Sequence, residues 1–214
     1  FYFTAVVGME PFHVGLALGI ALMFDAVSDP LVGSISDNWH SRWGRRHPLM
    51  VMSLLPLCVS MYFLFNFPQG LSAPLQFGWL LVSTILVRTF LTFFQVPYTA
   101  LGAEMSNDYA ERSRIFSYRT LFGWFCGVGF TIYAYNVLFA TTDEYPNGLL
   151  NPAAYPNLAL TAILLICVGV IVCVGTTYKV GARLPPPVHK TSFTLARTFR
   201  ELLSALQSFN FKVL

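Results

Sequence analysis

Residues 25–48, DAVSDPLVGSISDNWHSRWGRRHP, are the stretch that decides the fold. Asp25 and Asp29 are its only charged residues before Asp37, and a basic turn, residues 44–46, stands near its end. Together with the residues before it, its first half is apolar or small over about 20 positions, the length that crosses a bilayer as a helix. Ionisable side chains inside a span are costly and by default mark the path of an ion or a substrate. The stretch therefore predicts a membrane span that carries function, followed by a tight turn at the membrane surface.

The composition of the whole chain agrees with a membrane location. Of its 214 residues, 55% are hydrophobic and 11% are charged, whereas soluble domains have about 25% charged residues. These proportions exclude an ordinary soluble domain, and they exclude disorder, which needs low hydrophobicity and high charge. The formal net charge is +3 and no run of five like charges occurs, so no nucleic-acid partner is expected.

Windows of membrane length predict five complete helices and an all-α membrane fold. A short piece of another span, residues 1–8, precedes them. The segment 141–157 between the last two helices is rich in Pro, Asn and Gly and predicts an exposed loop. The five predicted spans are residues 14–35, 48–67, 75–103, 115–140 and 158–178.

Basic residues gather in alternate connecting segments. One basic group follows the first complete span, a second lies just before and at the start of the fourth span, and a third occupies the tail from residue 179 onward. The segments on the opposite side hold no Lys or Arg. By the positive-inside rule the basic segments are cytoplasmic. Arg88, midway along the third complete span, is the exception. We expect a multi-pass integral protein of the plasma, or inner, membrane that contacts the lipid bilayer.

The segment after the last complete span is expected to be a cytoplasmic linker, residues 179–208. A Pro-rich stop, residues 184–187, is followed by apolar residues at helical spacing, such as Leu195, Phe199 and Leu202. This pattern fits a helix on the membrane surface or a linker helix packed on the protein. Residues 209–214 are expected to begin another span.

Asp25 and Asp29 are one helical turn apart, so both carboxylates lie on one face. Two hard oxygen donors beside Pro30, which frees a backbone carbonyl one turn earlier, make a site for Na⁺ or a carried proton. The alternative is that the carboxylates pair with Arg88 and only hold helices together. An intramembrane protease is disfavoured, because its two carboxylates must nearly touch around the substrate; no enzyme is expected.

A polar stripe on the third complete span, Arg88, Thr92 and Gln95, offers donors that suit a carboxylate, phosphate or hydroxyl of a solute. The alternative for Arg88 is a plain counter-charge to Asp29. Tyr98 adds a hydroxyl to the candidate substrate-binding set, although a lone Tyr in a span is more often packing. No cofactor is expected beyond the coupling cation, Na⁺ or H⁺.

The four cysteines, Cys58, Cys126, Cys167 and Cys173, lie in apolar runs without a CxxC pair or a nearby His. They are interpreted as small buried hydrophobic residues rather than as a redox or zinc site.

The loop after the first complete span resembles the major facilitator superfamily, whose helices two and three are joined by G-x-x-x-D followed by G-R-R. The longer pattern over residues 25–48 resembles the glycoside-pentoside-hexuronide:cation symporter family, typified by the melibiose permease. A second stretch, residues 96–101 followed by Asp108, Arg112 and Arg119, resembles that family's fourth helix and the loop after it. The residues that match the first pattern are Gly33, Asp37, Gly44, Arg45 and Arg46.

The resemblance implies a role for each of these groups. Asp25 and Asp29 match the carboxylates that bind the coupling cation, and the basic loop latches the two halves by charge pairs that break when the cytoplasmic side opens. Arg112 belongs to a loop of conformational coupling. Gln95 stands where the melibiose permease has an Asp that contacts the sugar, which weakens any assignment to galactosides.

The resemblance also implies the architecture and function of the whole protein. Residues 1–178 would be the N-terminal bundle, with the end of helix one and helices two to six, and its partner would be the C-terminal half of the same transporter. The implied function is cation-coupled symport of a sugar or related small polar solute by alternating access. The alternatives are a sodium-dependent lysolipid symporter of the same superfamily and a non-transporting scaffold or receptor.

Overall fold

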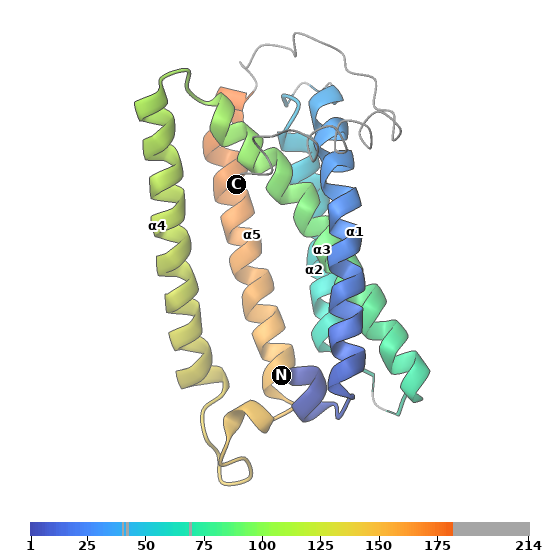
Figure 1. The fold of residues 1–214 in the computed structure, drawn as a ribbon. Helices are drawn as coiled ribbons and strands as arrows, with labels where there is room; N and C mark the ends of the chain where they lie inside the picture. The colour runs from blue at the N-terminus through green and yellow to red at the C-terminus, as the bar shows by residue number, and fades with distance from the viewer. Residues whose placement is uncertain (40, 42, 69, 182–214) are drawn as a thin grey trace, which may run out of the picture.

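The computed structural model describes residues 1–39, 41, 43–68 and 70–181, and within them it contains helices and no strands. Five long helices make up the bundle (Figure 1). Each is long and apolar enough to cross a membrane, which confirms the expected all-α membrane fold and its five spans. These helices are α1 (Pro11–Asn38), α2 (His47–Phe65), α3 (Ala73–Glu104), α4 (Tyr109–Tyr133) and α5 (Ala154–Gly181).

All five helices begin before their predicted starts, whereas α2 ends at Phe65, two residues before its predicted end. α1 begins at Pro11, which suits a first helical turn because its missing N–H needs no partner there. The helix α4 begins six residues before the predicted start, because Asp108 caps it by accepting from the N–H groups of Ala110 and Glu111. A hydropathy window leaves this charged first turn out of the predicted span, although the Asp108 cap makes the turn helical.

Helix α3 packs along both α1 and α2, and α2 packs along α5. At the end of the α2–α5 contact, His47 Nε2 and Thr177 Oγ1 are 2.9 Å apart. Gly181 leaves room for the His47 ring, because a Cβ there would lie 2.2 Å from it. Within the described residues, α4 contacts α3 only sparsely and has no buried residue. Figure 1 shows it standing at the edge of the bundle.

The segments outside the five helices are short. Residues Tyr2–Val6 form a π-helix, η1, which lies beside α1. The Tyr2 ring packs on Tyr155 of α5, with centroids 4.2 Å apart. A second π-turn, η2 (Ala134–Leu138), continues α4, and η3 (Gly148–Leu150) lies in the loop before α5. The assignment of residues 1–8 to helix one stays a prediction.

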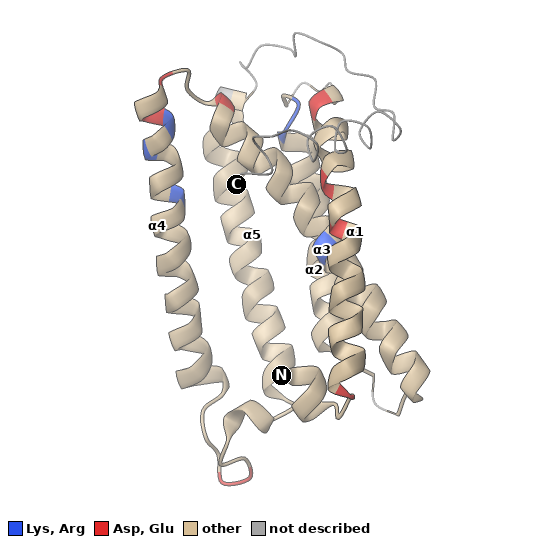
Figure 2. Cartoon of the chain, in the orientation of Figure 1, with Lys and Arg blue, Asp and Glu red and all other residues tan. Residues whose placement is uncertain are grey.

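Basic residues mark one end of the bundle (Figure 2). The described Lys and Arg residues gather at one end, except for the intramembrane Arg88, and acidic residues mark the loop at the other end. The end that the basic residues mark is the one predicted to be cytoplasmic. The predicted linker from residue 182 onward, with its amphipathic helix, and the span predicted to start at residue 209 lie outside the described residues.

Candidate functional site

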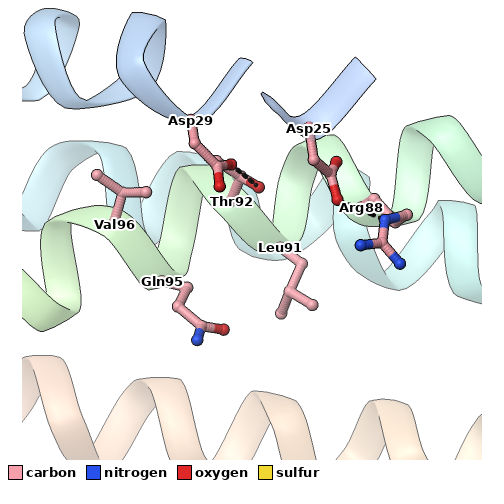
Figure 3. Close-up of a pocket in the computed structure, with 7 residues that line it drawn as sticks. All are labelled: Asp25, Asp29, Arg88, Leu91, Thr92, Gln95 and Val96. Atoms are coloured by element: carbon pink, nitrogen blue, oxygen red, sulfur yellow. Dashed lines mark hydrogen bonds and ion pairs between the residues drawn. The ribbon is translucent and has the colours of Figure 1, made fainter. Parts of the chain in front are cut away.

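The two aspartates of α1 face α3 near the middle of both helices (Figure 3). Arg88 Nε donates to Asp25 Oδ2 at 2.5 Å, and Thr92 Oγ1 donates to Asp29 Oδ1 at 3.0 Å. Each partner lies 63 residues farther along the chain. Because the separation is the same for both pairs, α1 and α3 run in the same direction, and successive turns of one helix face successive turns of the other. The structure therefore brings together four of the site residues predicted from the sequence.

An open cavity of about 260 Å³ lies beside these two pairs. Gln95 lines it one turn beyond Leu91, and its amide points toward the open side, away from the aspartates (Figure 3). The terminal nitrogens of Arg88 point away from the Asp25 carboxylate. The cavity thus presents charged and amide groups together inside the membrane region. Its full lining is Asp25, Asp29, Arg88, Leu91, Thr92, Gln95 and Val96.

The two carboxylates differ in their surroundings. The Asp25 side chain is 16% exposed, and its Oδ1 is buried without a hydrogen-bond partner among the described residues. Its charge is balanced through Oδ2 by Arg88, whose side chain is 36% exposed. Asp29 is exposed, and within the described residues its one hydrogen-bond partner is the neutral hydroxyl of Thr92. Asp29 is therefore the carboxyl group of the cavity that has no cationic partner among the described residues.

The donor set suits a small hard cation. Carboxylate, hydroxyl and amide oxygens, which this cavity offers, are the ligands that hard cations take in proteins. The described residues contain no group of three or more His, Cys, Asp and Glu placed to hold a metal ion.

Tyr98, predicted to bind substrate, does not line this cavity. It lines a second, larger groove of about 550 Å³ between α3, α4 and α5. There the guanidinium carbon of Arg119 lies 5.3 Å from the Tyr98 ring centroid, a cation–π distance. Arg119 also donates to Thr99 Oγ1 at 3.3 Å. The structure places Tyr98 with Arg119, and its role toward a substrate stays a prediction.

A cluster of charges joins the ends of α1 and α3 at the basic end of the bundle. Arg46 is 5% exposed and donates through Nη1 to Asp37 at 2.6 Å and to Ser36 at 2.9 Å. Its Nη2 donates to Glu104 Oε1 at 2.6 Å, and Arg45 reaches the same oxygen at 2.9 Å. The basic turn predicted to act as a latch is thus bound to both helices.

One glycine gives the basic turn its shape, and another lies where α1 approaches α3. Gly44 has a φ of +81°, the left-handed conformation that a tight turn requires and that a side chain disfavours. A Cβ built on Gly33 would lie 3.8 Å from the Val96 side chain, so α1 comes close to α3 at that turn.

Glu104 is a functional candidate that the sequence analysis missed. The predicted third span ended at residue 103, and the charge pairs of Arg45 and Arg46 were not assigned to an acidic partner. A signal was present, because Glu104 is an acidic residue at the same membrane edge as the basic turn. Arg112, by contrast, lies in the first turn of α4, and no salt bridge joins it to the described residues.

These features define a multi-span helical membrane protein with a charged cavity between two of its spans. A family model described as "MFS/sugar transport protein" matches residues 1–211. The chain belongs to this family of membrane transporters, and the resemblance to the major facilitator superfamily that the sequence predicts is confirmed.

Curated relatives are symporters by name. The chain is 34% identical over 127 residues to the uncharacterized symporter sll1374 of Synechocystis, covering 57% of this chain and 23% of the relative. It is 36% identical over 123 residues to the mouse sodium-dependent lysophosphatidylcholine symporter 1, covering 55% and 23%. It is 29% identical over 119 residues to the inner membrane symporter YicJ of Escherichia coli, covering 56% and 26%. The matches span about a quarter of each relative's length.

Proposed function

We propose that the complete protein is a secondary active transporter that carries a sugar or related polar solute together with a cation, by alternating access. The observation that carries this proposal is the cavity between α1 and α3. It holds two carboxylates, a guanidinium, a hydroxyl and an amide inside spans that are otherwise apolar. Such groups are costly in a membrane and mark an ion or solute path. Nothing in this arrangement calls for catalysis.

The residues divide between the two ligands. The aspartates of α1 attract the coupling cation, Na⁺ or H⁺, to the cavity. Gln95 and the terminal nitrogens of Arg88, which point away from the aspartates, are placed to bind hydroxyl or acidic groups of a solute. Coupling follows because a cation that raises the affinity for the solute must have its own affinity raised by the same factor.

The charge cluster of Arg45, Arg46, Asp37 and Glu104 is the proposed gate. It fixes the basic turn to the ends of α1 and α3. Its ion pairs hold the cytoplasmic end in one arrangement, and an alternating-access cycle requires that end to rearrange. Arg112, in the first turn of α4 at the same end, is proposed to take part in the same step.

One observation favours a lysolipid as the alternative solute. The groove between α3, α4 and α5 has a volume of about 550 Å³ and mainly apolar walls, with Arg119 at its lining. An acyl chain suits apolar walls, and a guanidinium suits a phosphate group. The mouse relative is named as a lysophosphatidylcholine symporter.

The test is uptake by the complete protein in proteoliposomes across glycosides, hexuronates and lysolipids, with and without a Na⁺ or H⁺ gradient. We expect one class to show cation-stimulated uptake. Asp29→Asn should lower that stimulation by about tenfold or more, the effect of about 1.4 kcal/mol of lost binding. Asp143→Asn, in the exposed loop before α5, is the matched control and should leave it unchanged. Equal cation stimulation in the Asp29 variant and wild type would contradict the proposal, and a scaffold would show no uptake at all.

A further inference from the structure

A buried histidine joins the start of α2 to the end of α5. His47 is the first residue of α2, and its side chain is fully buried. Its Nε2 lies 2.9 Å from Thr177 Oγ1. The edge of the ring that carries Nδ1 faces Gly181, where a Cβ would lie 2.6 Å from Nδ1. Nδ1 has no hydrogen-bond partner among the described residues, and neither the cavity nor the charge cluster uses this imidazole.

The hydrogen bonds at this contact indicate which ring nitrogen carries the proton. The Thr177 hydroxyl donates its one hydrogen to the Cys173 carbonyl oxygen at 2.6 Å. Toward His47 it can therefore only accept, so Nε2 carries the hydrogen and Nδ1 has a free lone pair. Nδ1 is thus the atom at which this ring takes up a second proton. That proton would create a buried N–H group without an acceptor, which is unfavourable.

The surroundings of His47 give an imidazolium no counter-charge. No carboxylate of the described residues lies within ion-pair distance of the ring, and the N-terminus of α2 is the positive end of the helix dipole. The two carboxylates nearest in the structure are already bound by the neighbouring arginine. The packed contact therefore admits only the neutral ring. The charged and titratable groups that the described elements bring to this end of α2 are Arg45 and Arg46 of the basic turn, Asp37 of α1, Glu104 of α3, and Cys173, Tyr178 and Lys179 of α5.

We propose that His47 is a proton-sensitive fastener, which holds the end of α5 on α2 while it is neutral and releases that end when Nδ1 is protonated. Because the packed state holds only the neutral ring, the contact is complete at about pH 7.5. It weakens as the pH falls below about 6.5, where a free imidazole takes up its proton. His47 directly follows Arg46, so the release occurs beside the charge cluster. This inference requires neither the coupling cation nor the solute and goes beyond the proposed function.

The test is hydrogen–deuterium exchange, read by mass spectrometry, in the complete purified protein at about pH 7.5 and pH 5.5. Each rate is corrected for the pH dependence of the chemical exchange itself. In the wild type, the backbone amides of residues 174–181 should lose protection by about tenfold at the lower pH, which is about one unit below the value for a free imidazole. Equal protection at the two pH values would overturn the inference.

His47→Gln separates the effect of the proton from that of packing. A glutamine amide can still donate to Thr177 but takes up no proton, so protection should be the same at both pH values. His13→Gln, which removes a half-exposed imidazole at the opposite end, is the matched control and should keep the wild-type loss at the lower pH. A loss that persists in folded His47→Gln would belong to another group and would refute the role of His47.

Gly181→Ala tests the same contact without altering the histidine. The added methyl occupies the space of the ring, so the end of α5 should exchange at about pH 7.5 as fast as the wild type does at about pH 5.5. Folding of every variant is checked by monodisperse elution in detergent. Wild-type protection of residues 174–181 in Gly181→Ala at the higher pH would contradict the inference, because the ring would then not hold α5.

Discussion

Arg46 shows how one side chain joins two helices and a loop. It is almost fully buried, and its guanidinium is bound by Asp37 and Ser36 on α1 and by Glu104 on α3. A buried guanidinium is tolerated when several acceptors satisfy it and is strongly destabilising when one is removed. The stability of the basic end of the bundle therefore depends on the residues around Arg46.

We expect Glu104→Gln to destabilise this end. The substitution removes the negative charge that Arg45 and Arg46 share. A hydrogen bond to a charged group contributes about 1.5–3 kcal/mol, so the melting temperature of the purified complete protein should fall. Thermal unfolding in detergent measures this effect. Glu144→Gln, in the exposed loop at the opposite end, is the control and should melt like wild type. An unchanged melting temperature for Glu104→Gln would show that the cluster adds no stability.

The residues found from the sequence and those that were missed differ in their local surroundings. Asp25, Asp29 and Arg88 were found because a charge inside an apolar run stands out in the sequence. Glu104 was missed because it lies at a span end, where charges are ordinary, and its partners are far away in the chain. The pairing of Asp25 rather than Asp29 with Arg88 depends on how α1 and α3 align, which spacing within one helix does not determine.

At the scale of whole helices, α3 is the centre of the bundle and α2 joins it to α5. The existence of the five helices follows from their apolar length, and sequence reasoning found all of them. Their ends did not follow, because capping by Asp108 and polar first turns extend a helix beyond its apolar part. Tyr98 was predicted to share a binding site with Gln95 because the two are close in sequence. In the structure Tyr98 lines the groove between α3, α4 and α5 instead.

The contact between α2 and α5 brings two cysteines close enough to be cross-linked by oxidation. Cys58 and Cys167 have their sulfur atoms 3.6 Å apart, so oxidation by copper phenanthroline should join them. In the complete protein with a protease site inserted in the loop of residues 141–147, the cut fragments should stay together on a denaturing gel until a reductant is added. Cys126→Ser should not change this result. Cys167→Ser should abolish it, and fragments that separate after oxidation of wild type would contradict the packing of α2 on α5.

At the scale of the whole molecule, the basic end and the acidic loop give the bundle a fixed polarity. The described Lys and Arg residues lie at one end, apart from Arg88, which lies within the membrane region (Figure 2). The positive-inside rule predicts that this end faces the cytoplasm.

Labelling of single introduced cysteines tests this orientation. In intact cells, a membrane-impermeant maleimide should label the variant Glu144→Cys in the loop before α5. Asn107→Cys, between α3 and α4, should be labelled only after the membrane is opened. The unmodified protein controls for the native cysteines. Labelling of Asn107→Cys in intact cells would reverse the assigned orientation.

The isolation of α4 within the bundle has a consequence for how the protein is made. Among the five spans it has the lowest hydropathy and the smallest buried share. During synthesis it must leave the translocon and stay in lipid with little help from the other described helices. Its own apolar residues therefore determine whether it inserts, and Arg112, Arg114 and Arg119 near its start determine which way it points. Within the described residues α4 makes few packing contacts, so with respect to these helices its substitutions act on membrane insertion more than on packing.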